Sequence, residues 1–197
     1  MRLAILCLSA SALLLSVGRA QVRAEDPVFA FTKEESSIKF NVKASVAIEG
    51  TFDKWDATLT YPSTDIATGV LDVKIQADSV NTGSGMKDGK LKSKAFFDVK
   101  QDPLITFHSN KIVQTGPNAV EVQGVFTIRG ATKPETLTFT ISGKGTGAGE
   151  LRGTMAFDRK DYGMNSGIPF IKIADRVEVT VDLKGKRVSG PPLVFKE

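Results

Sequence analysis

The chain of 197 residues contains one cysteine, Cys7, and one histidine, His108. Cys7 lies within an apolar N-terminal stretch, so the remaining chain has no thiol. That absence excludes disulfide bonds, cysteine nucleophiles and thiolate metal sites from the rest of the protein. A transition-metal site would have to consist mostly of carboxylates, and no calcium-loop spacing occurs. We therefore expect neither a metal nor a cofactor.

Long apolar runs are also scarce. The longest, residues 3–17, is shorter than the roughly 20 residues that a membrane-spanning helix needs. It follows Arg2 and precedes small residues at two cleavage points, after Ala20 and after Ala24. This arrangement predicts a signal peptide over residues 1–24 and secretion into the periplasm, with an uncleaved membrane anchor as the alternative. We expect residues 25–197 to form a single domain.

A strong excess of one charge is missing as well. The formal net charge is +4, and it falls to +2 after cleavage at Ala20 or +1 after cleavage at Ala24. Such a weak basic excess excludes a nucleic-acid partner on electrostatic grounds.

Catalytic groupings are few. His108 falls on the opposite phase of its strand from Phe107, so we expect it to face solvent without a Ser-His-Asp arrangement. Ser84 and Lys87 have the Ser-x-x-Lys spacing of penicillin-recognising enzymes, but the accompanying motifs are absent. The glycine-rich residues 143–149 lack the ending of a phosphate-binding loop. We therefore expect a protein that is not an enzyme.

Alternation of apolar and polar residues dominates the sequence, which is typical of strands with one buried face. It predicts about eight strands, including one long strand over residues 38–48, a bulge near residues 53–54, and a hairpin across residues 143–149. The gaps between most strands are too short for crossover helices, so the sheet is expected to be antiparallel. Residues 84–98 have helical spacing.

Such alternation fits either a closed barrel or a two-sheet sandwich. A closed eight-stranded barrel is filled by its own side chains or holds one small ligand. The inward phase contains three very small residues, Ala44, Gly124 and Gly153, among large aromatic ones. These small residues either leave space for a ligand or match bulky neighbours across the core, and the pattern alone favours neither.

Two long motifs resemble the YceI-like family. The segment DGKLKSKAFFDVKQDPLITF (residues 88–107) is similar to its signature segment, and GVFTIRGATKPETL (residues 124–137) follows in the family's order. The resemblance spans about residues 29–183. Relatives often have histidines near position 36 and at position 44, where this chain has Ser36 and Ala44, so any role of those histidines does not carry over.

The resemblance implies an all-β, lipocalin-like antiparallel barrel of eight strands, with one short helical segment near residues 84–98. It also implies a hydrophobic tunnel for a long isoprenoid or similar lipid. On this interpretation the tunnel lining and mouth comprise Phe40, Val42, Ala44, Trp55, Met86, Leu91, Phe96, Phe97, Phe107, Gly124, Phe126, Phe139, Met155 and Phe157. Because Phe96 and Phe97 are adjacent, we expect only one of them to pack into the core if they are helical.

The lysines of the helical segment, Lys87, Lys90 and Lys92, have two interpretations. They form either a solvated face or a positive rim for a lipid head group, and such a rim could make transient contact with an acidic membrane surface. The alternative to lipid carriage is a packed β-barrel or sandwich that binds a protein or a carbohydrate. The sequence leaves the oligomeric state open.

Overall fold

The computed structural model describes residues 26–45, 47–167 and 172–195. The predicted signal peptide, residues 1–24, lies outside these ranges. Within them, no helix has both the length and the apolar character to cross a membrane. The described elements are β1 (Val28–Phe31), η1 (Lys33–Glu35), β2 (Ser37–Ala44), β3 (Ile48–Phe52), β4 (Trp55–Thr60), η2 (Ile66–Thr68), β5 (Val70–Gln76), η3 (Ala77–Ser79), β6 (Val80–Asn81), α1 (Gly85–Lys92), β7 (Leu104–Gly116), β8 (Ala119–Ile128), β9 (Ala131–Ser142), β10 (Ala148–Asp158), η4 (Arg159–Tyr162) and β11 (Ile173–Ser189).

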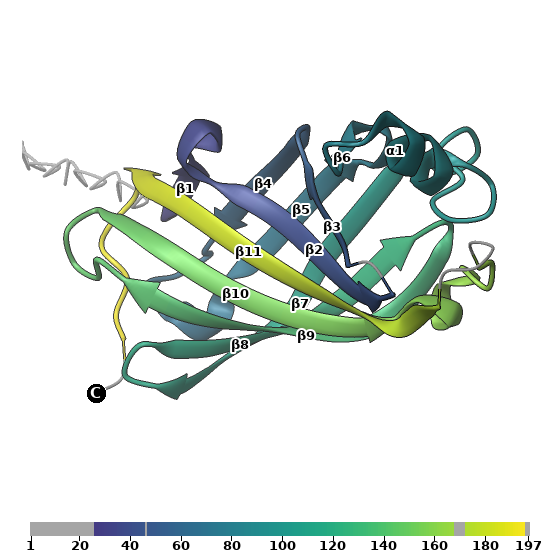
Figure 1. The fold of residues 1–197 in the computed structure, drawn as a ribbon. Coiled ribbons are helices and arrows are strands. Elements are labelled where there is room, and N and C mark those ends of the chain that lie inside the picture. Colours follow the sequence, from purple (N-terminus) through teal and green to yellow (C-terminus); the bar gives the residue numbers. More distant parts are fainter. Residues whose placement is uncertain (1–25, 46, 168–171, 196–197) are drawn as a thin grey trace, which may run out of the picture.

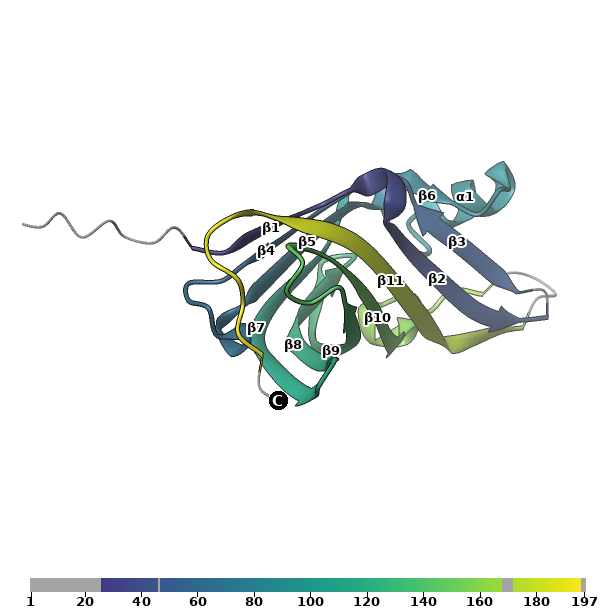
Figure 2. The same ribbon diagram turned by 90° about the vertical axis from the view of Figure 1, so that its left-hand side faces the viewer.

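Eight of the strands close into an antiparallel barrel in the order β1-β4-β5-β7-β8-β9-β10-β11 (Figures 1 and 2). Strand β1 completes the ring because it pairs with β4 on one side and with β11 on the other. Its residue Val28 lies opposite Thr60 of β4, and its residue Phe31 lies opposite Gly185 of β11. The predicted fold class, an eight-stranded antiparallel barrel with one short helix, is confirmed.

The 17-residue strand β11 pairs with β10 along one edge and with two different strands in succession along the other. Its C-terminal part pairs with β1, whereas its N-terminal part pairs with β2, as Val177 does with Val42. Strands β2, β3 and β6 continue the sheet from there, and α1 lies beside them at the same end of the molecule (Figure 1). The other end carries the β9–β10 hairpin, so the barrel has an α1 end and a hairpin end.

The single strand predicted over residues 38–48 is wrong, because the chain turns back within it. Strand β2 ends at Ala44, and β3 begins at Ile48 and pairs antiparallel with β2. Val42 lies directly opposite Ile48, so both face the core, and their even sequence separation keeps the alternation unbroken through the turn. The bulge predicted near residues 53–54 is wrong as well. These residues connect β3 to β4, and the two strands do not pair with each other.

The predicted helical segment is shorter than expected. Helix α1 ends at Lys92, and the chain then turns, with the Phe97 amide bonded to the Leu91 carbonyl and the Phe96 amide to the Ser93 carbonyl. Because Phe96 and Phe97 follow the helix instead of belonging to it, both side chains are buried, contrary to our expectation that only one would be.

The small inward residues do not leave space in the barrel. A methyl group at Gly124 would lie 2.4 Å from the His108 carbonyl oxygen and 2.7 Å from the Phe107 ring. A methyl group at Gly153 would lie 2.3 Å from the Phe139 ring. Both glycines are therefore sites of close approach between strands, and the alternative that they match bulky neighbours is the correct one.

Candidate functional site

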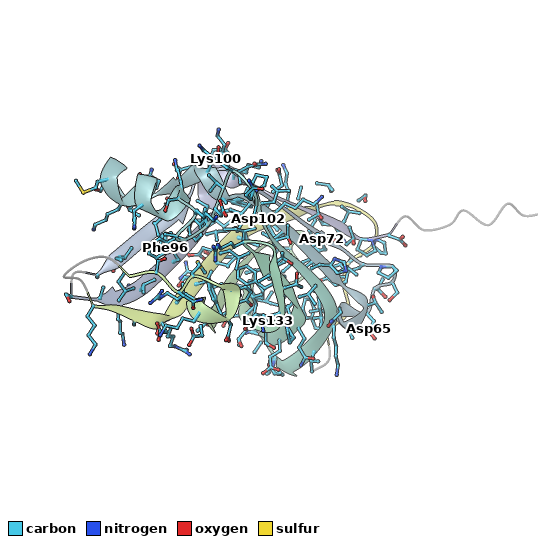
Figure 3. All side chains as sticks on the ribbon, turned by 90° about the vertical axis from the view of Figure 1, so that its right-hand side faces the viewer. Asp65, Asp72, Phe96, Lys100, Asp102 and Lys133 are labelled. Atoms are coloured by element: carbon cyan, nitrogen blue, oxygen red, sulfur yellow. The ribbon has the colours of Figure 1, made fainter. Side chains whose placement is uncertain are left out.

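The barrel interior holds an apolar cavity at the α1 end, with a volume of about 80 Å³. We call it the α1-end cavity. Strands from most of the sheet contribute to it, and the α1 segment covers it; Figure 3 shows Phe96 below the helix, on the side of the barrel strands. Its lining comprises Ile38, Phe40, Val42, Ile48, Phe52, Ile75, Leu91, Phe96, Phe97, Ile105, Phe126, Ile128, Phe157, Arg159, Met164, Ile173, Val177 and Val179.

Aromatic rings occupy two sides of this cavity. On one side the Phe52 ring centroid lies 5.6 Å from that of Phe40 and 5.8 Å from that of Phe97. On the other side Phe126 and Phe157 have centroids 5.2 Å apart, and the ring of Tyr162 packs edge-on against both. These tilted and edge-on contacts are favourable beyond the burial of their area, so they define the shape of the wall.

The hydroxyl of Tyr162 is the polar end of this aromatic group. It donates a hydrogen bond of 2.9 Å to Oε1 of Glu135 on β9. Burial raises the pKa of Tyr162 above its usual value, and the hydrogen bond to the Glu135 carboxylate adds to that shift. The tyrosine therefore stays protonated and neutral beside the apolar wall.

Among the described residues that line the α1-end cavity, Arg159 is the only ionisable one. Its Nε donates to the Ala174 carbonyl at 3.1 Å, its Nη1 donates to the Met164 carbonyl, and its Nη2 bonds Oδ1 of Asp175 at 3.0 Å. A hydrogen bond from Lys160 is the main cause of a lowered pKa at Asp175. The guanidinium is thus used to hold the chain segment around Met164, and it offers no free charge to a ligand.

A second cavity, of about 90 Å³, lies at the hairpin end. We call it the hairpin-end cavity. It shares no lining residue with the first, and our sequence reasoning missed it, because several of its walls come from the glycine-rich hairpin and from the C-terminal tail, where no alternation is present. Its lining comprises Phe29, Phe31, Leu59, Ile141, Ser142, Gly143, Lys144, Gly145, Gly147, Ala148, Gly149, Leu151, Gly185, Arg187, Pro192, Leu193 and Phe195.

Seven of the fourteen predicted tunnel residues line the α1-end cavity, and none lines the hairpin-end cavity. The seven are Phe40, Val42, Leu91, Phe96, Phe97, Phe126 and Phe157. The strand residues that we omitted, such as Ile38 and Val177, lie on the same inward phase, so the alternation of apolar and polar residues could have identified them. The alternation could not have identified Arg159 and Met164, because they come from a 3-10 helix and the irregular chain after it.

Five further predicted residues belong to the core but line neither cavity: Trp55, Phe107, Gly124, Phe139 and Met155. The side chains among them are buried against neighbouring strands. The two cavities share no lining residue, so they stand in place of the single tunnel that we expected.

Two predicted residues lie outside the interior. Ala44 is half-buried at the end of β2 and borders neither cavity. Met86 is 88% exposed. It lies five residues before Leu91, the buried residue of α1, which places it about 140° around the helix from that side chain. The prediction that Met86 lines the tunnel is therefore wrong.

Residues 29–185 match the sequence model of the YceI-like domain. The chain belongs to the YceI-like family. A UPF0312 protein from Pseudomonas syringae pv. syringae is 28% identical over 170 residues, which is 82% of this chain and 87% of the relative. A UPF0312 protein from Yersinia pseudotuberculosis is 30% identical over 143 residues, which is 72% of this chain and 73% of the relative.

Two solved structures share the fold of this chain. BcnA from Burkholderia cenocepacia superposes with a TM-score of 0.71 at 25% identity, covering 78% of this chain and 98% of BcnA. A polyisoprenoid-binding domain from Saccharophagus degradans has a TM-score of 0.62 at 14% identity, covering 81% of this chain and 98% of that domain.

The two motifs that carry the family resemblance meet at the α1 end. Arg129, in the second motif, has a positive φ of 53°. Its Nη2 donates to the Lys94 carbonyl of the first motif at 2.9 Å, and its Nη1 donates to the Gly163 carbonyl after η4. These bonds fasten the segments on either side of the α1-end cavity, so this arginine positions the cavity wall.

The predicted lysine rim lies beside the same cavity. Lys87 is exposed, and Lys90 and Lys92 are half-buried. The ammonium group of Lys90 lies 5.9 Å from the centroid of the Phe96 ring, a cation–π contact at the edge of the cavity wall.

His108 faces solvent, as the alternation predicts. Its Nδ1 lies 2.7 Å from Oδ1 of Asp72, its cross-strand neighbour on β5, and both side chains are well exposed. Within the described residues no hydroxyl is hydrogen-bonded to the imidazole, and no group of three or more histidine, aspartate or glutamate side chains is placed to hold a metal ion. The two side chains form an exposed hydrogen-bonded contact on the outer face of the barrel.

Proposed function

We propose that this YceI-like protein is a periplasmic binding protein that holds the apolar chain of an isoprenoid or similar amphiphile in its barrel and catalyses no reaction. The observation that carries the proposal is the α1-end cavity, whose described lining is apolar apart from Arg159, and each nitrogen of that guanidinium already donates to an oxygen of the protein. Each buried methylene of a bound chain would contribute about 0.8 kcal/mol. The polyisoprenoid-binding domain from Saccharophagus degradans, which shares the fold, supports this choice of ligand.

A long chain would need more room than the cavity now provides. Its volume of about 80 Å³ is below the roughly 150 Å³ of an engineered apolar cavity that holds benzene. Leu91, Phe96 and Phe97 come from the helix and turn that lie against the barrel, not from its strands. We expect these three side chains to shift when a chain enters, because they move without breaking the strand pairing.

Blocking the cavity tests the proposal. Val179 of β11 lines the α1-end cavity, and Val188 of the same strand is 55% exposed. We expect Val179→Phe to reduce binding of a fluorescent polyprenyl chain at least about tenfold, while the matched control Val188→Phe binds as the wild type does. Equal binding by the two variants would favour the alternative, a packed barrel that recognises a protein or a carbohydrate on its surface.

The natural ligand can be identified from protein purified under native conditions. We expect organic extraction followed by mass spectrometry to reveal an apolar chain from the wild type and much less from Val179→Phe.

The periplasmic location rests on the signal-like N-terminus, and it predicts a mature chain that begins at Gln21 or Glu25. N-terminal sequencing of the secreted protein checks this, and a membrane-bound product that retains residues 2–17 would contradict it.

The lysines at the α1 end support transient contact with an acidic membrane during loading. Lys87 is exposed, and each lysine near such a surface contributes about 1 kcal/mol. The exposed Met86 on the same helix provides an apolar contact. We expect a variant with Lys87, Lys90 and Lys92 changed to Gln to sediment less with anionic vesicles, and equal sedimentation of the two proteins would refute the contact.

A further inference from the structure

Arg187 extends the inward phase of β11 to the hairpin end of the barrel. The inward-facing residues before it on the strand are Val181, Leu183 and Gly185. Arg187 is the next residue on this face, and it lines the hairpin-end cavity. Its backbone is fixed on both sides, because Arg187 lies opposite Phe29 of β1 and its amide bonds the Gly147 carbonyl at 2.8 Å. A cation is thus directed by the strand register into an otherwise largely apolar space.

The guanidinium of Arg187 has no partner among the described residues. Its Nη1 is buried without a hydrogen bond, and none of the ion pairs found in the described ranges includes it. A buried donor that loses its water without gaining an acceptor is costly, so such a group calls for an explanation. Arg159 at the opposite end of the barrel differs, because its N–H groups donate to backbone carbonyls and to Asp175.

The surroundings of Arg187 combine a second cation with apolar walls. Lys144 of the β9–β10 hairpin also lines the cavity, and its ammonium lies 4.8 Å from the Phe195 ring centroid. The described lining includes no carboxylate. Apart from Ser142 and the glycines, the remaining side chains are apolar: Phe29, Phe31, Leu59, Ile141, Ala148, Leu151, Pro192, Leu193 and Phe195. The cavity therefore matches a ligand with a negative group joined to an apolar chain.

We propose that the hairpin-end cavity is the head-group site for an anionic amphiphile. Arg187 binds the carboxylate or phosphate of the ligand, Lys144 adds positive charge at the mouth, and the apolar walls contact the adjoining part of the chain. This inference rests on the proposed function, since it assumes that the barrel accepts a chain and that the packed layer around Phe139 opens to let the chain pass. It places the head group at the end opposite Lys87, Lys90 and Lys92, where the sequence had suggested it.

The test compares two ligands with the same chain, farnesyl phosphate and farnesol, on the mature protein. Because charge-assisted hydrogen bonds are the stronger kind, we expect the wild type to bind the phosphate at least about tenfold more tightly than the alcohol. Arg187→Gln should remove this preference and leave the affinity for farnesol within about twofold. The control Lys186→Gln changes an exposed charge on the same strand and should keep the preference.

Each other outcome has a defined meaning. A wild type that binds both ligands equally, or an Arg187→Gln variant that keeps the preference, overturns the head-group site and leaves the proposed function intact. Binding of neither ligand contradicts the proposed function itself. Inorganic phosphate that displaces farnesyl phosphate at similar concentrations would identify a free-anion site instead. The thermal midpoint reports folding, and if Arg187→Gln does not fold, Lys144→Gln must weaken phosphate binding without affecting farnesol.

Discussion

The ring of Phe139 lies against Gly153, its direct cross-strand neighbour, so closely that a methyl group there would be 2.3 Å from the ring carbon Cε1. Phe139 is 1% exposed and lines neither cavity. The pair therefore belongs to the packed layer that separates the α1-end cavity from the hairpin-end cavity. A glycine that looks like empty space in the sequence is the contact surface of an aromatic ring.

This contact predicts that Gly153→Ala destabilises the protein. The added methyl group has no room unless the Phe139 ring moves, and overpacking of this kind costs about 1–3 kcal/mol. Gly89→Ala is the control, because nothing lies within 4 Å of that position in α1, and alanine there should be neutral or stabilising by up to about 1 kcal/mol. Urea unfolding measures both, and adding Phe139→Leu to Gly153→Ala should recover part of the loss.

The buried guanidinium of Arg159 predicts a large loss of stability on its removal. Arg159→Leu would leave the carbonyls of Ala174 and Ser166 without their donor and Asp175 without one of its cations, at a cost on the order of 3 kcal/mol. Arg176→Leu is the matched control, because that side chain is exposed and its ion pair with Glu178 is long, at 3.6 Å. We expect it to cost less than about 1 kcal/mol by thermal or urea unfolding.

The two tyrosines predict an alkaline limit to stability. Burial raises the pKa of Tyr61, and burial together with Glu135 raises that of Tyr162. Because each pKa is higher in the folded state, the neutral tyrosines make their full contribution to stability below the unfolded-state pKa of about 10. That contribution declines as the pH rises from there towards the folded-state pKa.

Phenolate absorbance measures this directly, because the chain has only these two tyrosines. We expect little phenolate in the folded protein just above pH ~10, followed by a joint rise of phenolate and loss of β-sheet signal. Tyr162→Phe should lessen the dependence of stability on alkaline pH, although it leaves Glu135 without its donor. Reversible titration of both tyrosines near pH ~10 in the intact barrel would contradict the expectation.

The exposed pair of His108 and Asp72 predicts a negligible role. His108→Ala should change the free energy of unfolding by less than about 1 kcal/mol and should leave chain binding unchanged, since the pair faces solvent away from both cavities. Calorimetry and the polyprenyl binding assay check both points. Loss of a turnover activity in this variant would show that the protein is an enzyme after all.

Much of the fold was predictable because alternation reports directly which face of a strand is buried. It identified the antiparallel sheet, the β9–β10 hairpin and inward residues such as Phe126 and Phe157, whereas the closed barrel was implied by the family resemblance. The same rule concealed the turn between β2 and β3, because Val42 and Ile48 share a face on either side of it. Periodicity indicates only which face of the sheet a side chain is on. When the chain turns back and the facing residues are an even number of positions apart, the alternation continues as if there were no turn.

The sequence by itself determined the family, the strand phase and the absence of any cysteine after residue 7. Only the tertiary structure decided which inward residues border a cavity and which fill the layer between, because that depends on the neighbour across the strand. Gly124 meets the Phe107 ring, and Gly153 meets Phe139. The structure likewise separated two arginines that look alike in sequence, since Arg159 is satisfied by carbonyls brought to it by the chain around Met164, and Arg187 is not.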